Sequence, residues 1–188
     1  MIVIDAHLDL SYNALNWNRD LRLPVSEIRR LETGMTEKGR ATNTVAFPEL
    51  RAGQVGLCLG TVLARAKPEG TSNIDFRNQE IAFAMAQGQL AYYRVLEAEG
   101  ECRLVRDAAG LRTSFDSWQT DGAQAPFGFL LSMEGADPIV SPAQTAHWWD
   151  DGLRVVGLAP LRSERVRAWH GLCRGSHSKG SRSVTRDG

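Results

Sequence analysis

Three ionisable side chains stand on alternate positions near the N-terminus: Asp5, His7 and Asp9, within the stretch IDAHLDL. They follow a run of apolar residues at positions 2–4 that is typical of a β-strand. Residues two apart in a strand point to the same face, so we expect the three side chains to share one face near the end of the strand. An imidazole nitrogen beside carboxylate oxygens is a ligand set that suits Zn²⁺ and similar divalent ions.

A further acid, Glu134, follows the apolar run FGFLLSM, and Gly135 after it allows a turn. In parallel α/β folds, ligands collect at the carboxyl ends of the strands. A carboxylate facing the His7/Asp9 pair could bridge two ions, and two metals about 3.5–4 Å apart can activate a water and polarise a carbonyl. Structural alternatives remain open: Asp9 could cap the following turn with His7 packed against it, and Glu134 could be an acid at a helix N-terminus.

The elements that must position these residues alternate between strands and helices. Apolar runs predict strands at 2–5, 56–65, 102–105, 127–133 and 153–159, and apolar spacing with proline and glycine signals predicts helices at 47–56, 73–100, from 106 onward and at 141–152. The polar, arginine-rich stretch up to about residue 44 carries no predicted element. Strands that are apolar on both faces indicate a parallel sheet, either doubly wound or a (β/α)₈ barrel. A complete barrel typically takes about 250 residues.

Composition places the chain among globular domains. With 188 residues and 43% hydrophobic content, it is long enough for one domain with a core. The cysteines, Cys58, Cys102 and Cys173, are odd in number and form no CxxC pair, so we expect no disulfide framework and a reducing compartment. We see no signal-peptide pattern and no apolar run long enough to span a bilayer, and therefore expect a cytoplasmic location and no membrane segment.

The charge is distributed unevenly along the chain. Residues 1–160 hold 15 Lys+Arg and 20 Asp+Glu, whereas residues 161–188 hold seven basic and two acidic residues. The second stretch has no apolar periodicity and is rich in Ser and Gly, so we predict a disordered tail. His170 and His177 lie in this tail, and we therefore do not assign them as metal ligands.

Several motifs, in the same order, resemble the renal (membrane) dipeptidase family of zinc metallopeptidases, family M19. VIDAHLDL followed by PELRAGQVG resembles the opening of that family, LLSMEGADPI its Glu-Gly strand end, and WWDDGLRVVGLA its next helix and strand. The resemblance covers about residues 2–159. It implies a (β/α)₈ barrel with a two-zinc site that hydrolyses dipeptides, and a possible homodimer.

By the same resemblance, His7 and Asp9 correspond to ligands of the first zinc ion and Glu134 bridges both ions, while Asp5 has no ligand role and stays a structural acid. The substrate-contacting histidine that the family pattern expects after the fifth strand is missing, because Pro160 stands there. We therefore expect a partial TIM-type barrel at residues 1–159, with about five of the eight strands, and a non-native basic tail at 160–188. We expect a dipeptide substrate and no nucleic-acid partner.

The composition of the tail suggests a frameshift. With permitted codons, the bases from Pro160 onward, read one base later, can encode a histidine at that position, followed by Tyr-Gly. Our hypothesis is that residues 160–188 are a shifted reading of a longer dipeptidase gene, which would leave this chain truncated and inactive. DNA sequencing tests it: codons that cannot produce the shifted reading would refute it.

Two other functions fit the sequence. The chain could belong to another metal-dependent hydrolase built on the same barrel, which an activity screen of a restored longer chain would separate from a dipeptidase. It could also be a non-catalytic α/β fragment whose basic tail binds nucleic acid or an acidic partner weakly and in a salt-sensitive manner. Deleting residues 160–188 without any effect on such binding would remove that option.

Overall fold

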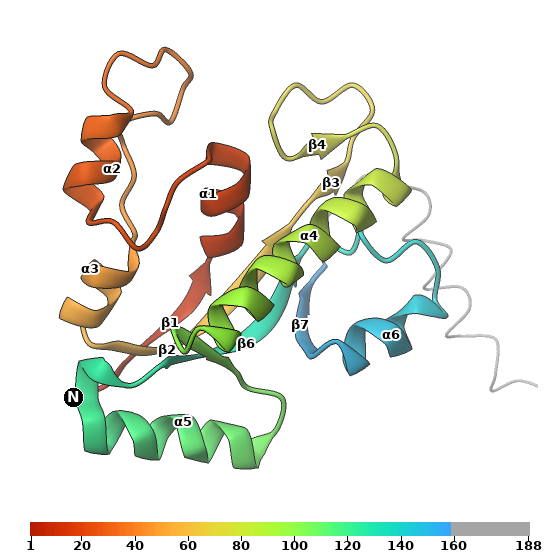
Figure 1. Cartoon of the computed structure of the whole chain (residues 1–188). Helices are drawn as coiled ribbons and strands as arrows, with labels where there is room; N and C mark the ends of the chain where they lie inside the picture. The colour runs from red at the N-terminus through yellow and green to blue at the C-terminus, as the bar shows by residue number, and fades with distance from the viewer. Residues whose placement is uncertain (159–188) are drawn as a thin grey trace, which may run out of the picture.

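A computed structural model describes residues 1–158 of the chain, and the hypotheses about Pro160, His170, His177 and the tail lie outside the described residues. Helices connect the strands of the central sheet along the chain (Figure 1). In chain order the elements are β1 Val3–Leu8, α1 Leu10–Trp17, α2 Val25–Leu31, α3 Phe47–Ala52, β2 Val55–Leu63, β3 Arg65–Ala66, β4 Asp75–Phe76, α4 Gln79–Ala98, β5 Cys102–Leu104, α5 Ala108–Asp121, η1 Gly122–Gln124, β6 Phe127–Glu134, α6 Gln144–Asp150 and β7 Leu153–Gly157.

The central sheet is parallel throughout, which confirms the predicted α/β class. Strand β1 pairs with β2 and β2 pairs with β6. The other edge of β6 is shared, because β5 pairs with its first half, up to Phe129, and β7 with its second half, from Leu131. Within residues 1–158 this sheet is open, and the carboxyl ends of its strands point the same way. A second, two-stranded sheet of β3 and β4 follows directly after β2.

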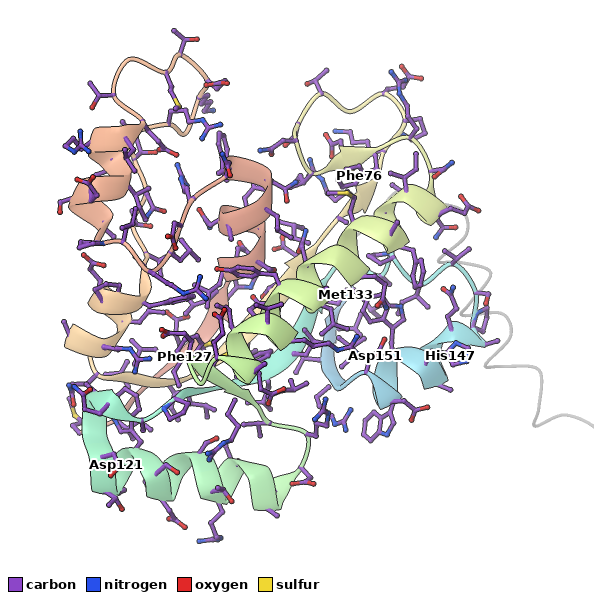
Figure 2. All side chains as sticks on the ribbon, in the orientation of Figure 1. Phe76, Asp121, Phe127, Met133, His147 and Asp151 are labelled. Carbon is purple, nitrogen blue, oxygen red and sulfur yellow. The ribbon has the colours of Figure 1, made fainter. Side chains whose placement is uncertain are left out.

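Helices α4 and α5 cover opposite faces of β6. The Tyr93 ring of α4 stacks on Phe129 at a centroid distance of 4.7 Å. A Cβ atom added at the preceding residue, Gly128, would lie 3.0 Å from Ser114 of α5. Successive strand residues point to opposite faces, so α4 and α5 lie on different sides of the sheet. Phe127 and Met133 mark the two ends of β6, and both are buried in the core (Figure 2).

The first strand is not buried as predicted. Ile4 is 64% exposed and Val3 is 36% exposed, although the prediction placed residues 2–5 in a buried strand. The physical reason is that β1 is an edge strand whose pairing partner within the described part of the chain is β2. An apolar run marks a strand, but it does not tell an edge strand from a central one.

Some predicted boundaries need correction. The helix predicted from residue 73 begins at Gln79, because the Asn78 side chain accepts a hydrogen bond from the Ile81 N–H and caps it. The helix predicted from residue 141 begins at Gln144, after turn hydrogen bonds to the carbonyls of Ser141 and Pro142. Helices α1 and α2 lie in the stretch that carried no predicted element.

The remaining helix and strand predictions hold to within a few residues. Helix α3 has Pro48 in its first turn and Gly53 at its C-cap, as its sequence predicted. Two other glycines predicted at helix ends, Gly100 and Gly152, both have positive φ. No helix among residues 1–158 combines the length and the apolar character that crossing a membrane requires.

Candidate metal site

Three of the four acidic and histidine residues singled out in the sequence come together in the fold. One ligand atom from each of His7, Asp9 and Glu134 lies within 4.8 Å of the others. His7 belongs to β1, Asp9 follows that strand directly, and Glu134 is the last residue of β6. Strand β2 separates β1 from β6, and parallel pairing brings the carboxyl ends of all three to one edge of the sheet.

The imidazole of His7 lies between the two acids. Its Nε2 atom is 3.3 Å from each carboxylate oxygen of Asp9 and 3.3 Å from Oε2 of Glu134. The side chains of His7 and Glu134 are 54% and 47% exposed, whereas that of Asp9 is 26% exposed. The group therefore opens to solvent on one side and is closed around Asp9.

Asp9 has an unusual environment for a carboxylate. Burial raises the pKa of Asp9; the nearby His7 lowers it and the negative charge of Glu134 raises it further. The Oδ1 atom of Asp9 is buried and makes no hydrogen bond among the described residues, although His7 Nε2 lies 3.3 Å from it. A buried carboxylate oxygen without a hydrogen bond is costly, and a cation beside it would remove that cost.

Neither Asp9 nor Glu134 has the helix-capping role that the sequence left open. Asp9 is the N-cap residue of α1, yet its side chain accepts no capping hydrogen bond from that helix. Glu134 ends a strand and does not lie at a helix N-terminus. Both carboxylates instead lie next to His7, an arrangement whose donor types fit a divalent metal such as zinc.

Asp5 does not join this group. Its Oδ1 atom accepts a hydrogen bond from the backbone N–H of His7 at 2.9 Å. The pairing register of β1 with β2 is irregular between Asp5 and Leu8, and Asp9 lies beyond the strand. Asp5 therefore lies outside the group of His7, Asp9 and Glu134, next to a stretch where the irregular register interrupts the simple alternation.

A buried polar network beside the site was not predicted. The Tyr93 hydroxyl of α4 donates to the Thr61 carbonyl of β2 at 3.2 Å and accepts from the Ser11 N–H of α1 at 3.4 Å. Ser11 Oγ donates to the same carbonyl at 3.0 Å. In the sequence, Tyr93 is one of several apolar positions at helical spacing, and the polar partner of its hydroxyl is 82 residues away. No local pattern could identify it.

The comparisons with known proteins agree on the fold. No family model matches the chain, and the search of curated proteins gives no match. Among solved structures, the dipeptidase AC, a metallopeptidase of family M19, superimposes with a TM-score of 0.56 at 22% identity over 85% of this chain and 43% of that one.

Two further solved structures give similar values. A metallopeptidase from Rhodobacter sphaeroides, liganded with a phosphinate mimic of the dipeptide L-Ala-D-Ala, has a TM-score of 0.55 at 20% identity and matches 85% of this chain and 45% of its own. The probable dipeptidase PvdM from Pseudomonas aeruginosa has a TM-score of 0.53 at 12% identity over 85% of this chain and 34% of its own. The chain thus spans less than half the length of each, and the resemblance to M19 metallopeptidases is confirmed for the fold.

Proposed function

We propose that this chain forms part of a metal-dependent dipeptidase in which His7, Asp9 and Glu134 are metal ligands. The observation that carries the proposal is the approach of these three side chains, with ligand atoms within 4.8 Å of one another, at the carboxyl edge of a parallel sheet. The likeness in fold to M19 dipeptidases supports the same conclusion. The barrel itself, of which the open sheet would be a part, belongs to the proposal.

The ligand roles in this proposal are those that the family resemblance implies. His7 and Asp9 would hold a first zinc ion, and Glu134 would bridge it to a second. The buried Oδ1 of Asp9 makes no hydrogen bond among the described residues, although His7 Nε2 lies 3.3 Å away, and this supports a cation at this place. Metal ions bound there supply Lewis-acid activation of a peptide carbonyl and of the attacking water.

The side chains themselves would fix the metal and leave room for the substrate. Asp5 holds the His7 backbone by its hydrogen bond to the N–H, which limits the positions that the imidazole can take. His7 and Glu134 are each about half exposed, so a small substrate such as a dipeptide can reach the group from the open side.

Metal titration of matched variants tests the ligand assignment. We expect Asp9→Asn to weaken zinc or cobalt binding by about tenfold or more, because it removes a charged ligand. Asp5→Asn is the matched control: it removes the charge of an acid outside the group, while the amide oxygen can still accept the hydrogen bond from the His7 N–H, and we expect little change in metal affinity. Equal losses in both variants, or none in Asp9→Asn, would contradict the proposed site.

The 188-residue chain itself should have little dipeptidase activity. Within residues 1–158, three side chains supply ligands, whereas two zinc ions with about four ligands each need a larger set. An assay of L-Ala-D-Ala hydrolysis with and without added zinc measures this directly. Robust zinc-dependent hydrolysis by the purified chain would show that the expectation is wrong.

A further inference from the structure

The N-terminus of α1 is capped in an unusual way. Asp is among the preferred N-cap residues because its carboxylate accepts a hydrogen bond from an N–H in the first turn. Asp9 occupies this position, but its side chain makes no such bond. Its carboxylate lies beside the His7 imidazole, at 3.3 Å from Nε2. One carboxylate cannot at the same time accept a hydrogen bond from the first turn of the helix and direct both oxygens toward the metal site.

The hydroxyl of Tyr93 takes over the capping role. The Ser11 N–H, one of the first-turn donors that have no partner within the helix, donates to the Tyr93 oxygen at 3.4 Å. Tyr93 reaches this place from α4, and its side chain is fully buried. Its own O–H donates to the Thr61 carbonyl of β2, so the hydroxyl joins α1, β2 and α4.

The protonation and orientation of Tyr93 suit this role. Burial raises the pKa of Tyr93, so the phenol keeps its proton and can donate and accept at the same time. Stacking on Phe129 at 4.7 Å fixes the plane of the ring. Ser11 Oγ also donates to the Thr61 carbonyl, which holds the first turn of α1 against β2.

We propose that Tyr93 is a positioning residue for the metal site: by capping α1 it frees the Asp9 carboxylate to face His7 and Glu134. This inference rests on the proposed metal site. Without the hydroxyl, the buried Ser11 N–H would lack this partner, and the carboxylate of Asp9, the N-cap residue, is an acceptor that can replace it. Rotation of the Asp9 side chain toward the helix end would take a ligand atom away from His7 and Glu134.

The variant Tyr93→Phe tests the proposal, because it removes the hydroxyl and keeps the ring that stacks on Phe129. We expect cobalt to bind about tenfold or more weakly to this variant, as is typical when the support of a metal ligand is lost, with an altered visible absorption spectrum. Tyr92→Phe is the matched control: Tyr92 is the adjacent residue, and its hydroxyl takes no part in this network. We expect its cobalt affinity and spectrum to equal those of the unchanged chain.

A second pair of variants separates positioning from general destabilisation. In an Asp9→Ala background, Tyr93→Phe should have no further effect on cobalt affinity, because the ligand that it positions is absent. Thermal unfolding without metal verifies that each variant is folded. An equal loss of affinity in both backgrounds, or unchanged affinity in Tyr93→Phe alone, would overturn the proposal. Absence of cobalt binding by the unchanged chain would instead contradict the proposed function.

Discussion

At the scale of single residues, the proposed metal site would give Asp9 conflicting roles in folding and in metal binding. Its carboxylate is partly buried, lies near the negative charge of Glu134, and has one buried oxygen that makes no hydrogen bond among the described residues. Such an arrangement is unfavourable for the metal-free chain and useful for a cation. Functional sites commonly retain local interactions of this kind at a cost in stability.

This conflict predicts that Asp9→Asn stabilises the metal-free chain while weakening metal binding. The pKa of Asp9 is raised in the folded chain, so the free energy of unfolding of the chain falls as pH rises through that pKa. The neutral amide of Asn does not ionise and avoids this loss. We expect a gain of about 0.5–2 kcal/mol at neutral pH, measured by urea denaturation with a chelator present. A lower stability for Asp9→Asn than for the unchanged chain would contradict this account of the site.

The residues of the candidate metal site could be found from the sequence because their signal is local. His7, Asp9 and Glu134 each stand at or just beyond the end of an apolar strand, and parallel pairing brings such ends together. The role of Tyr93 could not be predicted, since it depends on contact between α4, α1 and β2 across 82 residues. The exposure of Ile4 depends in the same way on which strands are neighbours.

At the scale of elements, an ion-pair cluster links the segment after α1 to the end of α2. Glu32, which is 5% exposed at its side chain, accepts two hydrogen bonds from Arg19, at 2.8 and 3.0 Å. Arg40 donates to the same carboxylate at 3.1 Å, and both guanidinium groups lie over the Trp17 ring. This cluster holds the region between β1 and α3, for which the sequence predicted no element.

Removing the Glu32 carboxylate should destabilise the segment between β1 and α3. We expect Glu32→Gln to lower the free energy of unfolding by about 3 kcal/mol, because it removes the carboxylate charge that balances the buried guanidinium of Arg19. Glu37→Gln is the control: Glu37 also pairs with Arg40, but its side chain is 63% exposed, and we expect a loss below about 0.5 kcal/mol. Similar losses of unfolding free energy in the two variants would show that the buried Arg19–Glu32 pair contributes no more than an exposed one.

The same cluster predicts an acid-sensitive window. Hydrogen bonds from Arg19 lower the pKa of Glu32 from 4.5 to about 2. A carboxyl whose pKa is lower in the folded chain adds stability above pH 4.5, and this contribution is lost as pH falls toward 2. Urea midpoints between these pH values should therefore fall less steeply in Glu32→Gln than in the unchanged chain.

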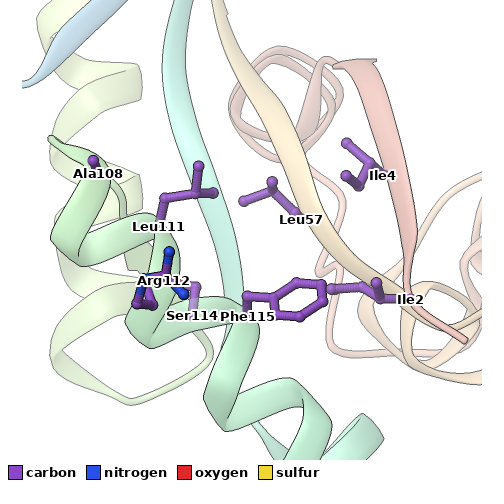
Figure 3. Close-up of a pocket in the computed structure, with 9 residues that line it drawn as sticks. Ile2, Ile4, Leu57, Ala108, Leu111, Arg112, Ser114 and Phe115 are labelled. Atoms are coloured by element: carbon purple, nitrogen blue, oxygen red, sulfur yellow. The ribbon is translucent and has the colours of Figure 1, made fainter.

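At the scale of the whole molecule, the open sheet leaves an apolar groove. Its volume is about 380 Å³, and its walls come from β1, β2 and α5, with Ile2, Ile4, Leu57, Leu111 and Phe115 among the lining residues (Figure 3). Ile4 and Phe115 are 64% and 45% exposed. Exposed apolar surface of this kind favours association, so we expect the chain to aggregate.

A charge introduced into this groove should reduce association. We expect Ile4→Glu to lower both light scattering and the fluorescence of a hydrophobic dye, because it interrupts the apolar surface between β1 and α5. Leu31→Glu is the control, since Leu31 is 52% exposed on α2 and does not line the groove. Equal effects of the two substitutions would mean that the groove has no special part in association.

The fold class could be predicted from the sequence because apolar strands alternate with helices along the chain. The arrangement of the strands could not be predicted, since β5 and β7 both pair along one edge of β6, an order that no local pattern encodes. The boundary of α4 could have been found from Asn78, a strong N-cap residue three positions before Ile81. The two early helices lack a comparable pattern of apolar spacing.

The central claim is that His7, Asp9 and Glu134 together bind a metal ion. A zinc-edge anomalous difference map of crystals of this chain grown with zinc would test it most directly. We predict a peak about 2.0–2.2 Å from Nε2 of His7 and from a carboxylate oxygen of both Asp9 and Glu134. A peak at Asp5 or His147 with none between these three side chains would contradict the account.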